Sequence, residues 1–146
     1  MTPAVGSAIY NEQVPVSPFQ EEELQYCISV DSNKHILDGS RNYTFRLPAG
    51  IPASNFWSII VYDMQSRLII PTDQSWPSVY SSLGSIKVNQ DGSIDTWFGP
   101  DAPKVAESNW VKTIPGKSWY LILRLYYPLE AWYNNSWKPG EIVEIK

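Results

Sequence analysis

Arg124 is the residue whose place in the sequence most suggests chemistry, because it interrupts the most hydrophobic strand-like stretch of the chain. In SWYLILRLYY, residues 118–127, alternate side chains would point to opposite faces of a strand. One set would form the core face: Trp119, Leu121, Leu123 and Leu125. The other set places one cation among aromatic and apolar residues: Tyr120, Ile122, Arg124 and Tyr126. A covered arginine needs an acidic partner, because an unpaired buried charge is costly.

Two interpretations of Arg124 stay open. In the first, the guanidinium forms an ion pair that braces the sheet, and the candidate partners are Asp63, Asp95 and Glu107. In the second, Arg124 is a cation in a concave groove lined by Tyr120 and Tyr126. Such a groove would hold an acidic or hydroxyl-rich ligand.

Four carboxylates could carry out acid/base chemistry: Asp63, Asp95, Asp101 and Glu107. Two carboxylates at roughly 5–9 Å can cleave a glycosidic bond, one as the acid and the other as base or nucleophile. Alternatively, Arg124 would neutralise a uronate while a tyrosine moves the proton. The sequence does not select between these routes, and it leaves open whether the protein is an enzyme.

Motifs for metal or nucleophilic catalysis are weak. NQDGSID, residues 89–95, spaces its oxygens like a calcium loop, but Gly92 is fourth and the twelfth residue is Pro100. A turn at Asp91-Gly92 is therefore favoured. His35 is the only histidine and no G-x-S-x-G motif is present, which disfavours a Ser-His-Asp triad. We expect neither a metal nor a cofactor.

Composition narrows the possible partners. The formal charge is −4 and no basic cluster exists, which argues against nucleic acid as a partner. No apolar run approaches the roughly 18 residues of a membrane span. Aromatic residues make up 14%, including seven tryptophans, and they either fill a β core or are partly exposed as ligand platforms. Flat rings with a polar handle suit both sugar faces and protein interfaces.

The sequence predicts that these residues are positioned by short strands, which are separated by Pro/Gly turns such as Asp38-Gly39. Residues 56–63 resemble a strand covered on both faces, which 66–70 would continue, and no amphipathic helix is evident. The pattern predicts an all-β fold, a single-domain antiparallel β-sandwich of jelly-roll-like form. Residues 1–23 would be an N-terminal arm or linker remnant, and 24–146 the domain. The expected strands are 24–30, 43–47, 56–63, 85–89, 93–99, 110–113, 118–127 and 141–145.

Four stretches together resemble the domain-of-unknown-function family 1214, commonly the C-terminal partner of family 1254: LDGSRNYTFRLPAGIPASNFWSIIVYD, NQDGSIDTWFGPDAP, SNWVKTIPGKSWYLILRLYYPLEAW and SWKPGEI. The resemblance covers roughly residues 24–146. It implies a jelly-roll-like sandwich that is usually one part of a longer, often exported protein. It supplies no catalytic motif. Among the matching positions, Asp63, Asn109, Trp110 and Arg124 are the hardest to explain as turns or core residues.

The leading hypothesis is a glycan-directed module of a larger extracytoplasmic protein that binds, and if catalytic degrades, a cell-wall or surface polysaccharide. Its catalytic candidates are Asp63, Arg124, Glu107 and Asp95. Its ligand-binding candidates are Trp57, Trp110, Asn109, Tyr120, Tyr126 and Trp137. The alternative is a structural or assembly domain without chemistry, whose aromatic face contacts other domains of the parent protein. A carrier of a small apolar ligand would require a closed cavity.

Overall fold

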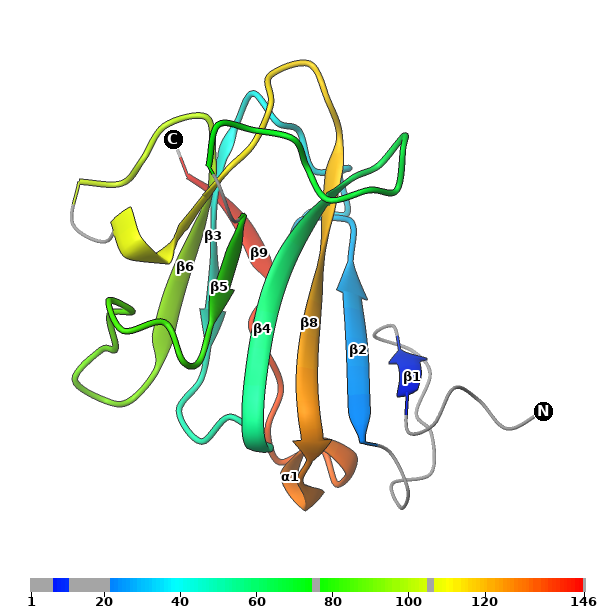
Figure 1. The fold of residues 1–146 in the computed structure, drawn as a ribbon, viewed down its shortest axis with the longest axis vertical. Coiled ribbons are helices and arrows are strands. Elements are labelled where there is room, and N and C mark those ends of the chain that lie inside the picture. Colours follow the sequence, from blue (N-terminus) through cyan, green and yellow to red (C-terminus); the bar gives the residue numbers. More distant parts are fainter. Residues whose placement is uncertain (1–6, 11–21, 75–76, 105–106, 146) are drawn as a thin grey trace.

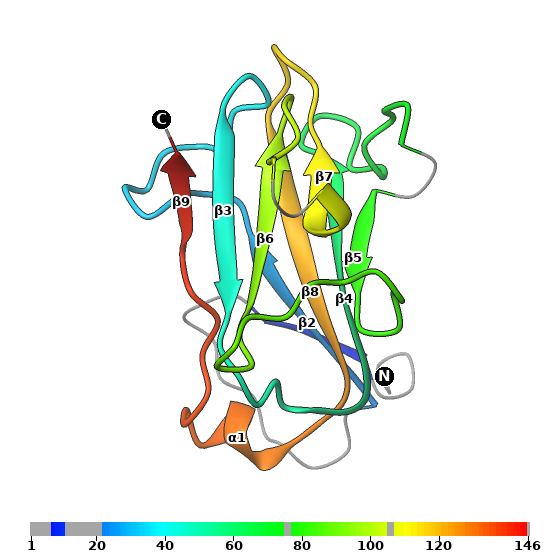
Figure 2. The same cartoon turned by 90° about the vertical axis from the view of Figure 1, so that its left-hand side faces the viewer.

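The chain folds as an all-β sandwich of two sheets. The computed structural model describes residues 7–10, 22–74, 77–104 and 107–145. Figure 2 shows the four-stranded sheet in front of the five-stranded sheet, and Figure 1 shows the two sheets after a turn of 90°. The first sheet has the order β1-β2-β8-β4-β5: β1 (Ser7–Tyr10), β2 (Glu23–Ile28), β8 (Trp119–Pro128), β4 (Ala53–Asp63) and β5 (Ser78–Tyr80). The second has the order β7-β6-β3-β9: β7 (Trp110–Lys112), β6 (Ile94–Gly99), β3 (Asn42–Leu47) and β9 (Ile142–Ile145).

The core lies between the sheets and follows the alternation of the strands. On β8 the predicted core face is confirmed, since Trp119, Leu121, Leu123 and Leu125 are fully buried. Strand β4 contributes Trp57, Ile59 and Val61 to this core, whereas its Phe56 and Tyr62 lie on the outside of the sheet. The prediction that 56–63 is covered on both faces is therefore wrong, because only one face packs between the sheets.

Trp119 joins the two sheets. Its ring lies 5.7 Å from the ring of Tyr43 on β3 and 5.1 Å from that of Phe98 on β6. The Tyr43 hydroxyl accepts a hydrogen bond from the Asp38 N–H at 3.0 Å, in the segment that precedes β3. Large buried aromatic rings contribute much of the apolar area that stabilises a sandwich.

Several strand expectations need correction. Residues 85–89 and 66–70 form no strand, while the short β5 lies inside a stretch that looks like a loop in the sequence. Asp38-Gly39 does form a turn, with Arg41 N–H donating to the Asp38 carbonyl, but no hairpin, because β2 and β3 belong to different sheets. Two neighbouring pairs are parallel, β1 with β2 and β6 with β7.

Part of the predicted N-terminal arm is a strand. Residues 7–10 pair in parallel with β2, in the register Ser7↔Glu23 to Tyr10↔Tyr26, and β2 itself begins one residue before the predicted domain boundary. Residues 1–6 and 11–21 lie outside the described part of the chain. The arm therefore extends the five-stranded sheet by one edge strand.

The tail after β8 packs against one end of the core. It includes the one-turn helix α1 (Glu130–Tyr133). Trp137 is buried, its indole N–H donates to the Pro48 carbonyl at 3.0 Å, and its ring lies 6.2 Å from that of Trp132. Neither α1 nor any other helix of the described residues has the length and apolar character needed to cross a membrane.

At Gly39, in the Asp38-Gly39 turn, the neighbouring backbone leaves no room for a side chain. A Cβ on Gly39 would lie 2.0 Å from the Ile114 carbonyl oxygen and 2.7 Å from that of Lys117. We expect Gly39→Ala to lower the free energy of unfolding by at least about 2 kcal/mol, because backbone atoms must move. Urea denaturation measures this. Gly84→Ala is the control, since nothing lies within 4 Å of its added Cβ. Equal effects of the two substitutions would contradict the close approach at Gly39.

Candidate functional site

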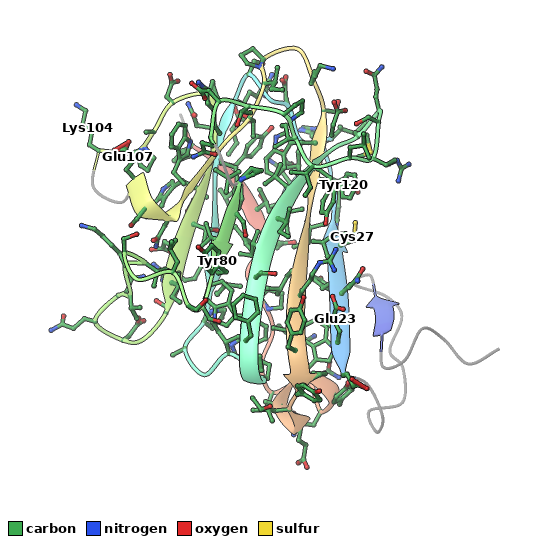
Figure 3. All side chains as sticks on the ribbon, in the orientation of Figure 1. Glu23, Cys27, Tyr80, Lys104, Glu107 and Tyr120 are labelled. Atoms are coloured by element: carbon green, nitrogen blue, oxygen red, sulfur yellow. The ribbon has the colours of Figure 1, made fainter. Side chains whose placement is uncertain are left out.

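The outer face of the five-stranded sheet carries a group of aromatic residues around Arg124, which we call the tyrosine face. The register of β4 against β8 pairs Tyr62 with Tyr120 and Phe56 with Tyr126. Figure 3 shows Glu23 and Cys27 extending from β2, Tyr80 from β5 and Tyr120 from β8. The tyrosine face comprises Phe56, Tyr62, Tyr80, Tyr120, Arg124 and Tyr126.

Arg124 is held at the centre of this face by two neighbours. Its Nη1 donates to Oε2 of Glu23 at 2.9 Å, and its Nη2 donates to the Tyr62 hydroxyl at 2.9 Å. Both members of the ion pair are largely covered, with 23% and 19% of their side chains exposed. Burial lowers the pKa of Arg124, but its bonds to Tyr62 and Glu23 outweigh this and leave the pKa above its ordinary value. The predicted acidic partner exists, but Asp63, Asp95 and Glu107 were the wrong candidates.

The rings of the tyrosine face are engaged with one another. Tyr62 and Tyr120 stack at 5.3 Å with 14° between their planes, and the Arg67 guanidinium lies 5.7 Å from the centre of the Tyr120 ring. Phe56 packs against Tyr126 at 5.4 Å and against Tyr80 at 6.2 Å. Tyr120 is 8% exposed. A sugar ring could not stack on Tyr120 without displacing a neighbour.

Asp63 stabilises the turn after β4. Its Oδ1 accepts the Gln65 N–H at 2.8 Å, and its Oδ2 lies 3.4 Å from Lys117 Nζ. The hydrogen bond from the Gln65 backbone, assisted by Lys117, lowers the pKa of Asp63 below its ordinary value. A carboxylate held in its charged form in this way is a poor proton donor at neutral pH.

Asp95 lies on the other sheet, where it pairs with Arg46. Arg46 Nε and Nη2 donate to the two Asp95 oxygens at 2.7 and 3.0 Å, and Asn89 Nδ2 donates to Oδ2 at 3.0 Å. The Arg46 hydrogen bonds, followed by the one from Asn89, lower the pKa of Asp95. Asp95 and Asp63 therefore belong to different sheets and to separate ion pairs.

The remaining polar candidates lie near β6 and β7. Glu107 is exposed at the start of the 3-10 helix η1 (Glu107–Asn109), and Asp101 contacts Asn42 at 3.4 Å. Asn109 is buried, and its side-chain amide bonds the Lys87 N–H, the Lys87 carbonyl and the Asp95 carbonyl, each at 2.9 Å. Asn109 thus serves the backbone of a loop and of β6.

The tryptophan candidates divide into two kinds. Trp57 and Trp137 belong to the core, where no ligand reaches their ring faces. Trp110 is only half-buried, on the outer face of β7, where its indole N–H donates to the Gly99 carbonyl at 3.1 Å. Its register partner on β6 is Trp97, also half-buried. In the described part of the chain, neither ring packs against another aromatic ring.

These two residues are part of a row that crosses the four-stranded sheet. The registers connect Trp110 to Trp97, Trp97 to Thr44, and Thr44 to Val143. We call Trp110, Trp97, Thr44 and Val143 the tryptophan row. The Arg46–Asp95 ion pair lies beside it, two residues along β3 and β6. Sequence reasoning missed Trp97, although the alternation of Ile94, Thr96 and Phe98 into the core already places Trp97 outside.

The fold is a β-sandwich whose two outer faces carry different aromatic and charged residues, and comparison with known proteins gives its family. Residues 22–130 match the family model "Protein of unknown function (DUF1214)". The chain belongs to this family. No curated protein matches it.

Two solved structures resemble this one. The VPA0106 protein from Vibrio parahaemolyticus is 27% identical with a TM-score of 0.73, over 86% of this chain and 31% of that one. An uncharacterized protein from Burkholderia cenocepacia is 15% identical with a TM-score of 0.53, over 92% of this chain and 32% of that one, and supports the fold alone. The chain thus spans about a third of the length of each structure.

The Glu23–Arg124 ion pair should contribute more to stability than an exposed pair. We expect a double-mutant cycle with Glu23→Gln and Arg124→Met to give a coupling of about 1–2 kcal/mol, because burial strengthens the attraction. Urea denaturation of the four proteins measures it. The matched control is Arg41–Glu144, where N and O are 3.1 Å apart but Arg41 is 55% exposed, so that a much smaller coupling is expected. Equal couplings would show that Arg124 does not brace the sheet.

Proposed function

We propose that this domain is a non-catalytic glycan-binding module and that the tryptophan row is its binding face. One observation carries the proposal: among the tryptophans that the structure describes, Trp97 and Trp110 neither belong to the core nor pack against another described aromatic ring. Trp57, Trp119 and Trp137 are core residues. Trp132 packs against Tyr26 and Trp137.

The surroundings of the row support a sugar ligand. An indole offers a broad apolar face for the C–H side of a sugar ring. Thr44 and the Arg46–Asp95 pair place hydroxyl, guanidinium and carboxylate groups beside the rings, and these can bond to sugar hydroxyls. An open sheet face, rather than a closed pocket, suits a polymer that extends past the protein on both sides.

The positions of the acids support binding without cleavage. A glycosidase needs two carboxyl groups that flank one bond at roughly 5–9 Å. Asp63 serves a turn of the five-stranded sheet, and Asp95 is bound by Arg46 and Asn89 on the other sheet. Arg124, the candidate for a uronate, lies on the tyrosine face, on the opposite side of the sandwich from the tryptophan row. No two of these groups meet around one substrate position.

The proposal predicts retention of the purified chain on at least one insoluble cell-wall polysaccharide, without release of reducing or unsaturated ends. Trp97→Ala should weaken binding by roughly tenfold or more, because truncating a tryptophan at a binding hot spot costs about 2 kcal/mol. Depletion from solution over a series of polysaccharide concentrations measures the affinity. Tyr126→Ala, a half-buried aromatic residue on the other sheet, is the matched control and should bind like the wild type.

Two results would count against the proposal. If a folded wild-type chain is retained by no polysaccharide of a broad panel, the glycan function is wrong. If soluble sugar is released and the release is lost in Arg124→Ala, the protein is an enzyme and its site is the tyrosine face. Circular dichroism of each variant separates lost binding from lost folding.

A second candidate function, assembly with another polypeptide, is favoured by the tyrosine face. Tyrosine and arginine are enriched at protein interfaces and their binding hot spots. The rings there are already held in place by one another, so a partner would order few side chains on docking. If two copies associate in this way, sedimentation velocity should show dimers that Tyr80→Ser removes and Trp97→Ala retains. A chain that stays monomeric at every concentration would contradict self-association.

A further inference from the structure

The charges around the tryptophan row carry information on the class of glycan. This step rests on the proposed function. We infer that the ligand is a neutral polysaccharide and that uronate-containing polymers are excluded. Two cations lie on strands of the row and on its face of the sheet, Arg46 on β3 and Lys112 on β7. Arg46 is bonded to Asp95 at 2.7 and 3.0 Å, and Lys112 Nζ lies 3.0 Å from Asp73.

Both of these cations are therefore already neutralised by a carboxylate of the protein. A uronate could reach Arg46 only by displacing Asp95, which would leave that carboxylate without its partner. A second acid also disfavours a uronate at Arg46. The hydrogen bond and charge of Asp95 make the larger contribution to raising the pKa of Arg46, and the charge of Asp91 adds to it. Asp73, Asp91 and Asp95 thus outnumber Arg46 and Lys112 on these strands and their loops, which disfavours an anionic polymer at these two positions.

Sugar hydroxyls face no such penalty. An ionised carboxylate has about four acceptor positions, and Asp95 uses three of them for Arg46 and Asn89. A hydroxyl can donate to the remaining position without breaking the ion pair, and a hydrogen bond to a charged acceptor is stronger than a neutral one. The pair can thus orient a neutral sugar beside Trp97.

The length of the row favours a chain over a single sugar. It crosses four strands, and three strand spacings amount to roughly 14 Å. Trp97 and Trp110 occupy one end and Val143 the other, where 44% of its surface is exposed. A short run of sugar units is needed to cover both ends.

Because the contacts are apolar rings and compensated charges, binding should depend little on salt. We expect the full chain to bind at least one of cellulose, xylan or mannan with an affinity that changes less than about twofold between low salt and about 0.5 M NaCl. Polygalacturonate and alginate should not be retained. Depletion of the chain from solution by insoluble cellulose, and isothermal titration with the soluble polymers, measure these affinities at both salt concentrations.

Removal of the carboxylates that pair with Arg46 and Lys112 should allow uronate-containing polymers to bind. Asp95→Asn frees Arg46 and Asp73→Asn frees Lys112, so each variant should gain at least about fivefold in binding to polygalacturonate at low salt. Asp73 is 78% exposed, so its substitution should leave the fold intact. The matched control is Glu23→Gln, which frees Arg124 on the opposite face and should produce no such gain.

The outcomes distinguish failure of the neutral ligand class from failure of the glycan-binding function. Wild-type binding to polygalacturonate or alginate that exceeds binding to neutral polymers, and that salt abolishes, would overturn the neutral class while leaving a glycan function. An equal gain in Glu23→Gln and Asp95→Asn would overturn the location at the tryptophan row. Retention by none of the polymers would overturn the proposed function itself.

Discussion

The burial of Trp119 between the sheets is the contact on which the rest of the structure depends. Its ring meets Tyr43 and Phe98, so that one side chain of β8 fixes the position of β3 and β6. Once Trp119 points inward, the period of two along β8 sends every second residue inward with it. Arg124 must then lie outside, on a sheet face rather than in the core.

The outer faces of the two sheets differ in how their aromatic side chains are packed. On the tyrosine face the rings pack against one another, and the central cation is matched by Glu23. On the four-stranded sheet the two indoles are neighbours in register, and neither packs against another aromatic ring of the described residues. The difference matters for recognition, because a ligand can gain from a surface only what the protein has not already satisfied within itself.

The sequence predicted features that depend on local periodicity. The all-β sandwich and the inward and outward sets of β8 follow from alternation and composition, and the structure confirms them. Features set by strand order were not predictable. Glu23 is 101 residues from Arg124 in sequence, and only the adjacency of β2 and β8 brings them together. The β6–β7 pairing and the short β5 also depend on contacts that single strands do not encode.

The candidate site, too, could be predicted from the sequence only in part. Asp63 and Asn109 looked functional because neither turn nor core composition explained them. In the structure, Asp63 accepts a backbone N–H of the turn that follows it, and Asn109 bonds the backbone of a distant loop at Lys87. Trp57 and Trp110 look alike as aromatic residues near strand starts, but one is buried and the other is not. Trp97 could have been found from its own strand, whose pattern already separates inside from outside. Hydrogen-bond satisfaction of an isolated polar residue, by contrast, is a property of the folded chain.

The separation of the two faces by a full double layer has a mechanical consequence. Two packed sheets are about 10 Å apart, and their backbones are tied by dense aromatic packing at Trp119. An object held at one face cannot touch, or compete with, an object held at the other. The domain therefore has the geometry of a rigid spacer, able to keep two bodies at a fixed distance and to transmit a pull from one to the other through its core.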